Sequence, residues 1–143
     1  MQTLRRVLFV SQRQAEGMRV PKAAALVSIT DPSRPPASLA AGWHAVLRLS
    51  FDDADPVTFA GQDAHLKPLS PSQVAEIAAF SAQHARCCKR IVVHCRHGIS
   101  RSAAVAKAIA QAAGLGFPAA YDEYNRHVHR MLEGAVRRSF DGA

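Results

Sequence analysis

Residues 91–114, IVVHCRHGISRSAAVAKAIAQAAG, contain a short apolar run, a polar segment with a glycine, and a long alanine-rich stretch. The run at 91–94 predicts a central strand buried on both faces, because its apolar residues are continuous rather than alternating. The alanine-rich stretch predicts a helix opened by Arg101 and ended by the final glycine, exposed only at Lys107 and Gln111. A strand, a ten-residue loop and a helix in this order are typical of an α/β fold.

Three further apolar runs predict strands. They lie at residues 7–10, 24–29 and 45–51, and the proline-rich segment 31–38 between the second and third predicts a surface loop. We therefore expect one α/β domain over residues 1–143, with a central, mostly parallel sheet flanked by helices.

Two more helices are expected in the second half of the chain. Ser70, Pro71 and Gln73 form a capping box with proline at the first helical position. The residues expected to face inward from this helix are Val74, Ile77, Ala78 and Ala85. A last helix is expected to begin near Pro118. Its inward residues would be Tyr121, Tyr124, Val128 and Leu132.

Composition narrows the class of protein. No apolar run reaches the ~20 residues of a membrane-spanning helix, and the N-terminal apolar run is too short for a signal peptide, so we expect a cytoplasmic protein that does not enter membranes. Three cysteines, with Cys87 and Cys88 adjacent, do not suggest a disulfide framework. There is no Cys-x-x-Cys pair, and His127 and His129 would face apart on a helix, so no metal site is predicted.

The net charge of +7 favours anionic partners. Basic residues gather near the C-terminus, but no aromatic residues interleave with them as a platform for stacking bases would require. The basic residues in question are Arg126, Arg130, Arg137 and Arg138. This pattern favours a solvated helix face over a nucleic-acid interface.

The polar segment can bind an anion. A loop that opens a helix directs backbone N–H groups and the positive end of the helix dipole at its centre, which would favour the thiolate form of Cys95. Arg101 offers a guanidinium that binds two phosphate oxygens, and Gly98 permits a tight turn. Ser102 could donate a hydrogen bond to the sulfur. The residue types therefore predict a phosphate site with a nucleophile at its floor.

Residues 94–102, HCRHGISRS, match the pattern H-C-x-x-G-x-x-R-S, and the segment resembles the signature loop of the cysteine-dependent protein tyrosine phosphatases. The ending G-x-S-R-S is most similar to the dual-specificity branch, and the wider likeness covers roughly residues 44–114. The resemblance implies a phosphatase-like fold and a metal-independent phosphoric monoester hydrolase that needs no cofactor. The expected partner is a phosphorylated protein or another anionic phosphate monoester.

The resemblance also assigns roles. Cys95 would form a cysteinyl-phosphate, and the phosphoryl oxygens would be bound by the loop residues Arg96, His97, Gly98, Ile99, Ser100 and Arg101. Ser102 would support the sulfur. His94 would orient the loop and favour the thiolate.

The general acid is expected from the segment AVLRLSFDDADP, residues 45–56, which resembles the strand and loop that carry this aspartate in dual-specificity phosphatases. Asp53 is the first choice, with Asp52 and Asp55 as neighbours. Asp53 precedes Cys95 by more residues than is usual in the family, and Asp63 lies nearer the usual separation. All four aspartates therefore remain candidates.

Other readings share parts of this pattern. Phosphoinositide phosphatases often carry lysines in the loop, which has none here, and RNA 5′-phosphatases of the same superfamily are compatible with the charge. A rhodanese-type sulfurtransferase also places a cysteine in an anion-binding loop, but does not require the G-x-S-R-S ending. A binding module without turnover would usually lack the cysteine.

Overall fold

Four strands form one parallel sheet in the computed structural model, which describes residues 2–55 and 65–142. The strands are β1 (Arg6–Ser11), β2 (Ala24–Thr30), β3 (Ala45–Ser50) and β4 (Arg90–Cys95), in the order β1-β4-β2-β3. Each predicted apolar run lies at one of these strands, and every pairing between them is parallel. The expected α/β class is confirmed in the described part of the chain.

Strand β4 is central, as the continuous apolar run predicted. It pairs with β1 on one side and β2 on the other, and its last five residues are buried. Because all strands are parallel, their carboxyl ends lie at one edge of the sheet. Ser11 of β1 is in register with Cys95, and Ser28 of β2 is in register with His94.

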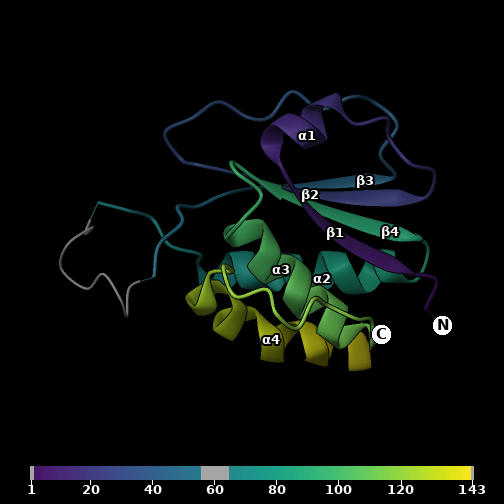
Figure 1. The fold of residues 1–143 in the computed structure, drawn as a ribbon. Coiled ribbons are helices and arrows are strands. Elements are labelled where there is room, and N and C mark those ends of the chain that lie inside the picture. Colours follow the sequence, from purple (N-terminus) through teal and green to yellow (C-terminus); the bar gives the residue numbers. More distant parts are fainter. Residues whose placement is uncertain (1, 56–64, 143) are drawn as a thin grey trace.

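The helices divide unequally between the two faces of the sheet (Figure 1). Helices α2 (Pro71–Ala85), α3 (Arg101–Ala112) and α4 (Arg126–Asp141) lie on one face, whereas the short α1 (Gln12–Gly17) lies on the other. Alanine side chains make up much of α3, and its residues 101–110 are buried apart from Lys107, which is half-buried. Small side chains let α3 pack closely between the sheet and α4.

Capping explains where the helices begin. The box predicted at Ser70 and Gln73 is present at the start of α2. An equivalent box of Ser11 and Gln14 starts α1, a helix that the sequence analysis did not predict. Its six residues are too few to show helical periodicity.

The prediction of a helix beginning near Pro118 was wrong. Helix α4 begins at Arg126, because the side chain of Asn125 accepts a hydrogen bond from the Val128 N–H at 3.0 Å. Val128 and Leu132 face inward as expected, but Tyr121 and Tyr124 precede the helix. None of the helices in residues 2–55 and 65–142 is long and apolar enough to cross a membrane.

Candidate active site

Cys95 is the last residue of the central strand, and α3 begins six residues later at Arg101. The connecting loop, residues 96–100, is half the length that the sequence predicted. The strand runs one residue beyond the predicted range 91–94, to Cys95, and the helix starts at Arg101 as expected. The short loop brings Cys95 close to the N-terminal end of α3.

The Cys95 sulfur faces the first turn of this helix. Its Sγ lies 3.1 Å from the Ser102 Oγ, within hydrogen-bonding distance. Both residues are buried, and Cys95 is a free thiol with 3 % of its surface exposed. When the sulfur is ionised, the serine hydroxyl can donate to it. The predicted pairing of Cys95 with Ser102 is therefore present.

Gly98 is the residue that lets the loop turn. Its φ is +73°, and a Cβ at this position would lie 2.4 Å from the Ser11 nitrogen and 2.5 Å from the Val10 carbonyl carbon. A side chain would therefore be strained by the backbone and would collide with the end of β1. The sequence predicted the turn, but only the structure shows that the close approach of β1 also requires a glycine at position 98.

Backbone donors of the loop are available to a ligand. Within the described ranges, no protein group accepts a hydrogen bond from the backbone N–H groups of residues 97–100. Loop carbonyls, in contrast, do have partners: Arg96 accepts from the Gln12 N–H, and Ser100 accepts from the Asn125 N–H. Unpaired N–H groups ahead of a helix N-terminus form a suitable environment for an anion.

Arg101 is buried and anchored by one nitrogen. Its Nη1 donates to the Phe51 carbonyl at 2.7 Å and lies 2.8 Å from an Asp31 carboxylate oxygen. In the described part of the chain, Nη2 and Nε have no protein acceptor. One edge of the guanidinium is therefore held in place, and the other can bind two oxygens of an anion.

Asp31 is a site residue that the sequence analysis missed. It directly follows β2, so it lies at the same carboxyl edge as Cys95. Besides Arg101, it lies 4.0 Å from the Arg96 guanidinium, whose side chain is 47 % exposed. The signal was available, because a carboxylate immediately after a buried parallel strand is placed at this edge.

Asp53 and Asp52 have different hydrogen-bond partners in the structure. The Asp53 carboxylate accepts hydrogen bonds from the Ser100 hydroxyl and the Asn125 amide, each at 2.9 Å, so it contacts the loop. The Asp52 carboxylate instead accepts from the Lys67 N–H at 2.8 Å. Asp55 lies two residues further along, half-buried, and Asp63 lies outside the described residues.

Asn125 was also missed. Its amide donates to Asp53 and to the Ala54 carbonyl, while its Oδ1 caps α4. Tyr121 comes from the same connection and donates its hydroxyl to the Ile99 carbonyl. The segment after α3 therefore holds the loop and the aspartate together. Helix caps such as Asn125 are visible in a sequence, but their tertiary partners are not.

His94 lies behind the loop, on the opposite face of β4 from Cys95. Its ring is fully buried and its Nε2 lies 2.6 Å from the Ser28 Oγ. Burial lowers the pKa of His94, and the positive charges of Arg48 and Arg101 act in the same direction, against the hydrogen bond to the Cys95 carbonyl and the charge of Glu16. The ring is therefore neutral near pH 7 and positions the end of β4 through hydrogen bonds rather than through charge.

Comparisons of this chain with protein-family models, with curated proteins and with solved structures gave no match. In the part of the chain that the structure describes, a buried thiol, an anchored guanidinium, N–H groups without a protein acceptor and the Asp53 carboxylate beside the loop lie at one edge of the sheet. Together these groups offer a candidate nucleophile, a candidate anion site and a candidate proton donor.

Proposed function

We propose that this protein is a phosphoric monoester hydrolase of the protein tyrosine or dual-specificity phosphatase type, acting through a cysteinyl-phosphate intermediate. One observation carries the proposal: Cys95 Sγ lies 3.1 Å from the Ser102 Oγ, at the start of a short loop that leads to the anchored Arg101. The parallel sheet, with the loop between its central strand and a buried helix, is compatible with a phosphatase-like fold.

In the first step, the Cys95 thiolate attacks phosphorus and an S–P bond forms as the bond to the leaving oxygen breaks. The free edge of Arg101 and the loop N–H groups bind the non-bridging oxygens, whose negative charge they stabilise in the transition state. Asp53 transfers its proton to the leaving oxygen, so that a neutral alcohol or phenol departs. The hydrogen bonds from Ser100 and Asn125 keep this carboxyl beside the loop.

In the second step, water attacks the cysteinyl-phosphate. Asp53, now a carboxylate, accepts a proton from the water while the S–P bond breaks. Inorganic phosphate leaves, and Cys95 returns to the thiolate, to which Ser102 can donate a hydrogen bond. Atoms and charges balance over the two steps without a metal ion, because arginine and backbone dipoles supply the positive charge.

The proposed substrate is a phosphorylated protein or another phosphate monoester. The net charge of +7 favours anionic substrates in general. Two side chains of the loop, His97 and Ile99, are exposed, and we propose that they meet the part of the substrate beyond the phosphate.

The intermediate itself provides the test. The purified protein is mixed with an aryl phosphate in the presence of a chelator, quenched in acid within one turnover, and digested for mass spectrometry. We expect phosphate on the peptide that contains Cys95, turnover without added metal, and inhibition by vanadate. Turnover with no phosphorylated Cys95 at any quench time would contradict the mechanism. Transfer of sulfur from thiosulfate to cyanide, without aryl phosphate hydrolysis, would indicate a sulfurtransferase instead.

A further inference from the structure

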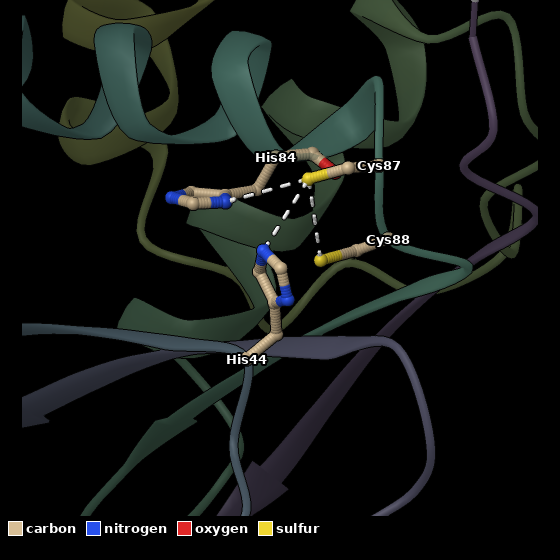
Figure 2. A group of neighbouring side chains, drawn as sticks. All are labelled: His44, His84, Cys87 and Cys88. Atoms are coloured by element: carbon tan, nitrogen blue, oxygen red, sulfur yellow. Dashed lines mark hydrogen bonds between the residues drawn. The ribbon is translucent and has the colours of Figure 1, made fainter.

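A second group of reactive side chains lies at the opposite edge of the sheet from the phosphate loop. It consists of His44, His84, Cys87 and Cys88, which we call the amino-edge cluster (Figure 2). His84 is in the last turn of α2, and the two cysteines follow in the turn that leads into β4. His44 comes from another part of the chain, immediately before β3.

The backbone holds these four residues in place. The N–H groups of Cys87 and Cys88 both donate to the His84 carbonyl, at 3.2 and 2.8 Å, which fixes the turn after α2. The His44 N–H donates to the Ala24 carbonyl at 2.9 Å, which ties the start of β3 to β2. The His84 ring also packs against Phe80, with 4.5 Å between ring centroids. The donors are therefore positioned by ordered structure.

The distances between the donor atoms fit one tetrahedral ion. Cys87 Sγ lies 3.5 Å from His44 Nε2, 3.8 Å from His84 Nδ1 and 4.0 Å from Cys88 Sγ, and all four donor atoms lie within 4.8 Å of one another. A tetrahedral zinc ion with ordinary Zn–S and Zn–N bonds separates its ligand atoms by roughly 3.3–3.8 Å. Small movements of the side chains would close the site.

The types of ligand atom in the cluster favour zinc over other metal ions. Two thiolates and two imidazoles in a tetrahedral arrangement are typical of zinc. The chain contains three cysteines and seven histidines, and two of each converge here, whereas the remaining cysteine is Cys95. Cys87 and His44 are exposed, so an ion can enter from solvent, while Cys88 is fully buried at the inner side.

We propose that His44, His84, Cys87 and Cys88 bind one Zn²⁺ ion that has a structural role. Four protein ligands would leave no open position for catalysis. The ion would join the end of α2 to the start of β3, which among the described strands lies at the edge of the sheet and pairs with β2. No metal site was predicted from the sequence, because the chain has neither a Cys-x-x-Cys pair nor histidines spaced to share one face of a helix. Adjacent cysteines with a histidine 43 residues before Cys87 do not form such a pattern.

Zinc binding is tested on the full chain carrying Cys95→Ser, so that the thiol of the phosphate loop cannot contribute. The metal-free, reduced protein is titrated with Zn²⁺ against a chromophoric chelator, and with Co²⁺ to record absorption. We expect one equivalent of zinc, a higher melting temperature with zinc, and Co²⁺ bands typical of tetrahedral coordination with thiolate-to-metal charge transfer. The absence of stoichiometric zinc binding would overturn the proposal.

Ligand variants identify the site. Cys87→Ser and His44→Ala replace exposed residues, so both variants should fold, and circular dichroism checks this. Each should weaken zinc binding by at least the 10–100-fold that loss of an outer-shell partner costs at a metal site. The matched control is His65→Ala, which removes another exposed histidine. Equal affinity in the ligand variants and the control would overturn the assignment, as would Co²⁺ spectra without thiolate bands. None of these results depends on phosphatase activity.

Discussion

At the carboxyl edge of the sheet one cysteine lies beside an arginine and a serine, whereas at the amino edge two cysteines lie beside two histidines. Near Cys95 lie the Ser102 hydroxyl, which accepts from the thiol and can donate to a thiolate, and the start of α3 with the Arg101 guanidinium and the loop N–H groups. Around Cys87, the neighbouring atoms are potential metal ligands: two imidazole nitrogens and a second sulfur.

The contrast is the reason for proposing different ligands for the two thiols, because the neighbours of a thiol favour one kind of ligand over another. Fixed positive charge and N–H groups suit an anion, and leave the sulfur free to act as a nucleophile. Converging lone pairs repel one another unless a proton or a metal cation lies between them, and a metal cation would hold the sulfur as a ligand. The topology of a parallel sheet keeps the two sites apart, because β4 runs from one edge to the other.

The largest expected effect separates the two edges directly. Cys95→Ser should abolish turnover, because a serine hydroxyl without an activating base is a far weaker nucleophile. The same variant should still bind vanadate or phosphate, since the loop and Arg101 are unchanged, and it should still bind zinc at the amino edge. Steady-state rates and equilibrium binding provide the measurements. Retention of more than about a tenth of the activity would exclude the covalent mechanism.

Asp53→Ala should slow phosphopeptide hydrolysis by roughly 10²–10⁴, the range expected of general acid catalysis. The hydrolysis of activated aryl phosphates should slow much less, because a nitrophenolate leaves readily without being protonated. Asp52→Ala is the matched control, since its carboxylate bonds to the Lys67 N–H and not to the loop.

The comparison should include Asp55→Ala and Asp63→Ala on both substrate types. If one of these variants alone shows the leaving-group-dependent loss, the acid is misassigned, although Cys95 and Arg101 keep their roles.

Arg101→Lys should reduce activity by ~10²–10³, the usual cost of losing a transition-state donor. A lysine has a single nitrogen, so it cannot bond to the Phe51 carbonyl and Asp31 while also binding two phosphoryl oxygens. Arg96→Lys is the control, because the Arg96 side chain is half exposed. This substitution should reduce activity by less than about tenfold. A twofold loss in Arg101→Lys would place this residue outside the phosphate site.

Gly98→Ala should destabilise the protein by about 1–3 kcal/mol and distort the loop, because a strained φ combines with a collision against β1. Gly114→Ala is matched to it in conformation, with φ of +71° but no atom within 4 Å of the added Cβ. Only the conformational penalty applies there, about 1 kcal/mol. Denaturant unfolding of both variants measures the difference. Equal losses would mean that β1 does not constrain the loop.

The smallest effect concerns pH and stability. The pKa of His94 is lowered from 6.5 by burial, so below about pH 6.5 the unfolded chain binds a proton that the folded chain does not. The contribution of His94 is therefore complete above its unfolded pKa and is lost as pH falls towards its folded pKa. The melting temperature should decline as the pH is lowered from 7.5 to about 5, and it should decline less steeply in His94→Gln. An unchanged slope in that variant would show that His94 is not the group responsible.

Local sequence was sufficient for much of the fold. The continuous apolar run before Cys95 identified the central strand, and the Ser70 capping box identified the start of α2. The spacing from Cys95 to Arg101, with Gly98 and Ser102, indicated the chemistry of the loop. These features depend on neighbours within a few residues, where periodicity, capping and turn preferences act directly.

Other features depend on segments that are distant in the sequence. Asp31 reaches Arg101 because β2 ends beside β4, and Asn125 reaches Asp53 because the chain returns past the loop before α4. The pairing of His44 with Cys87 likewise requires the start of β3 to lie against the turn after α2. The sequence by itself determined which residues could act as nucleophile and anion binder, because their spacing is local. The tertiary structure alone decided which carboxylate contacts the loop and which thiols meet imidazoles, because strand order sets those distances.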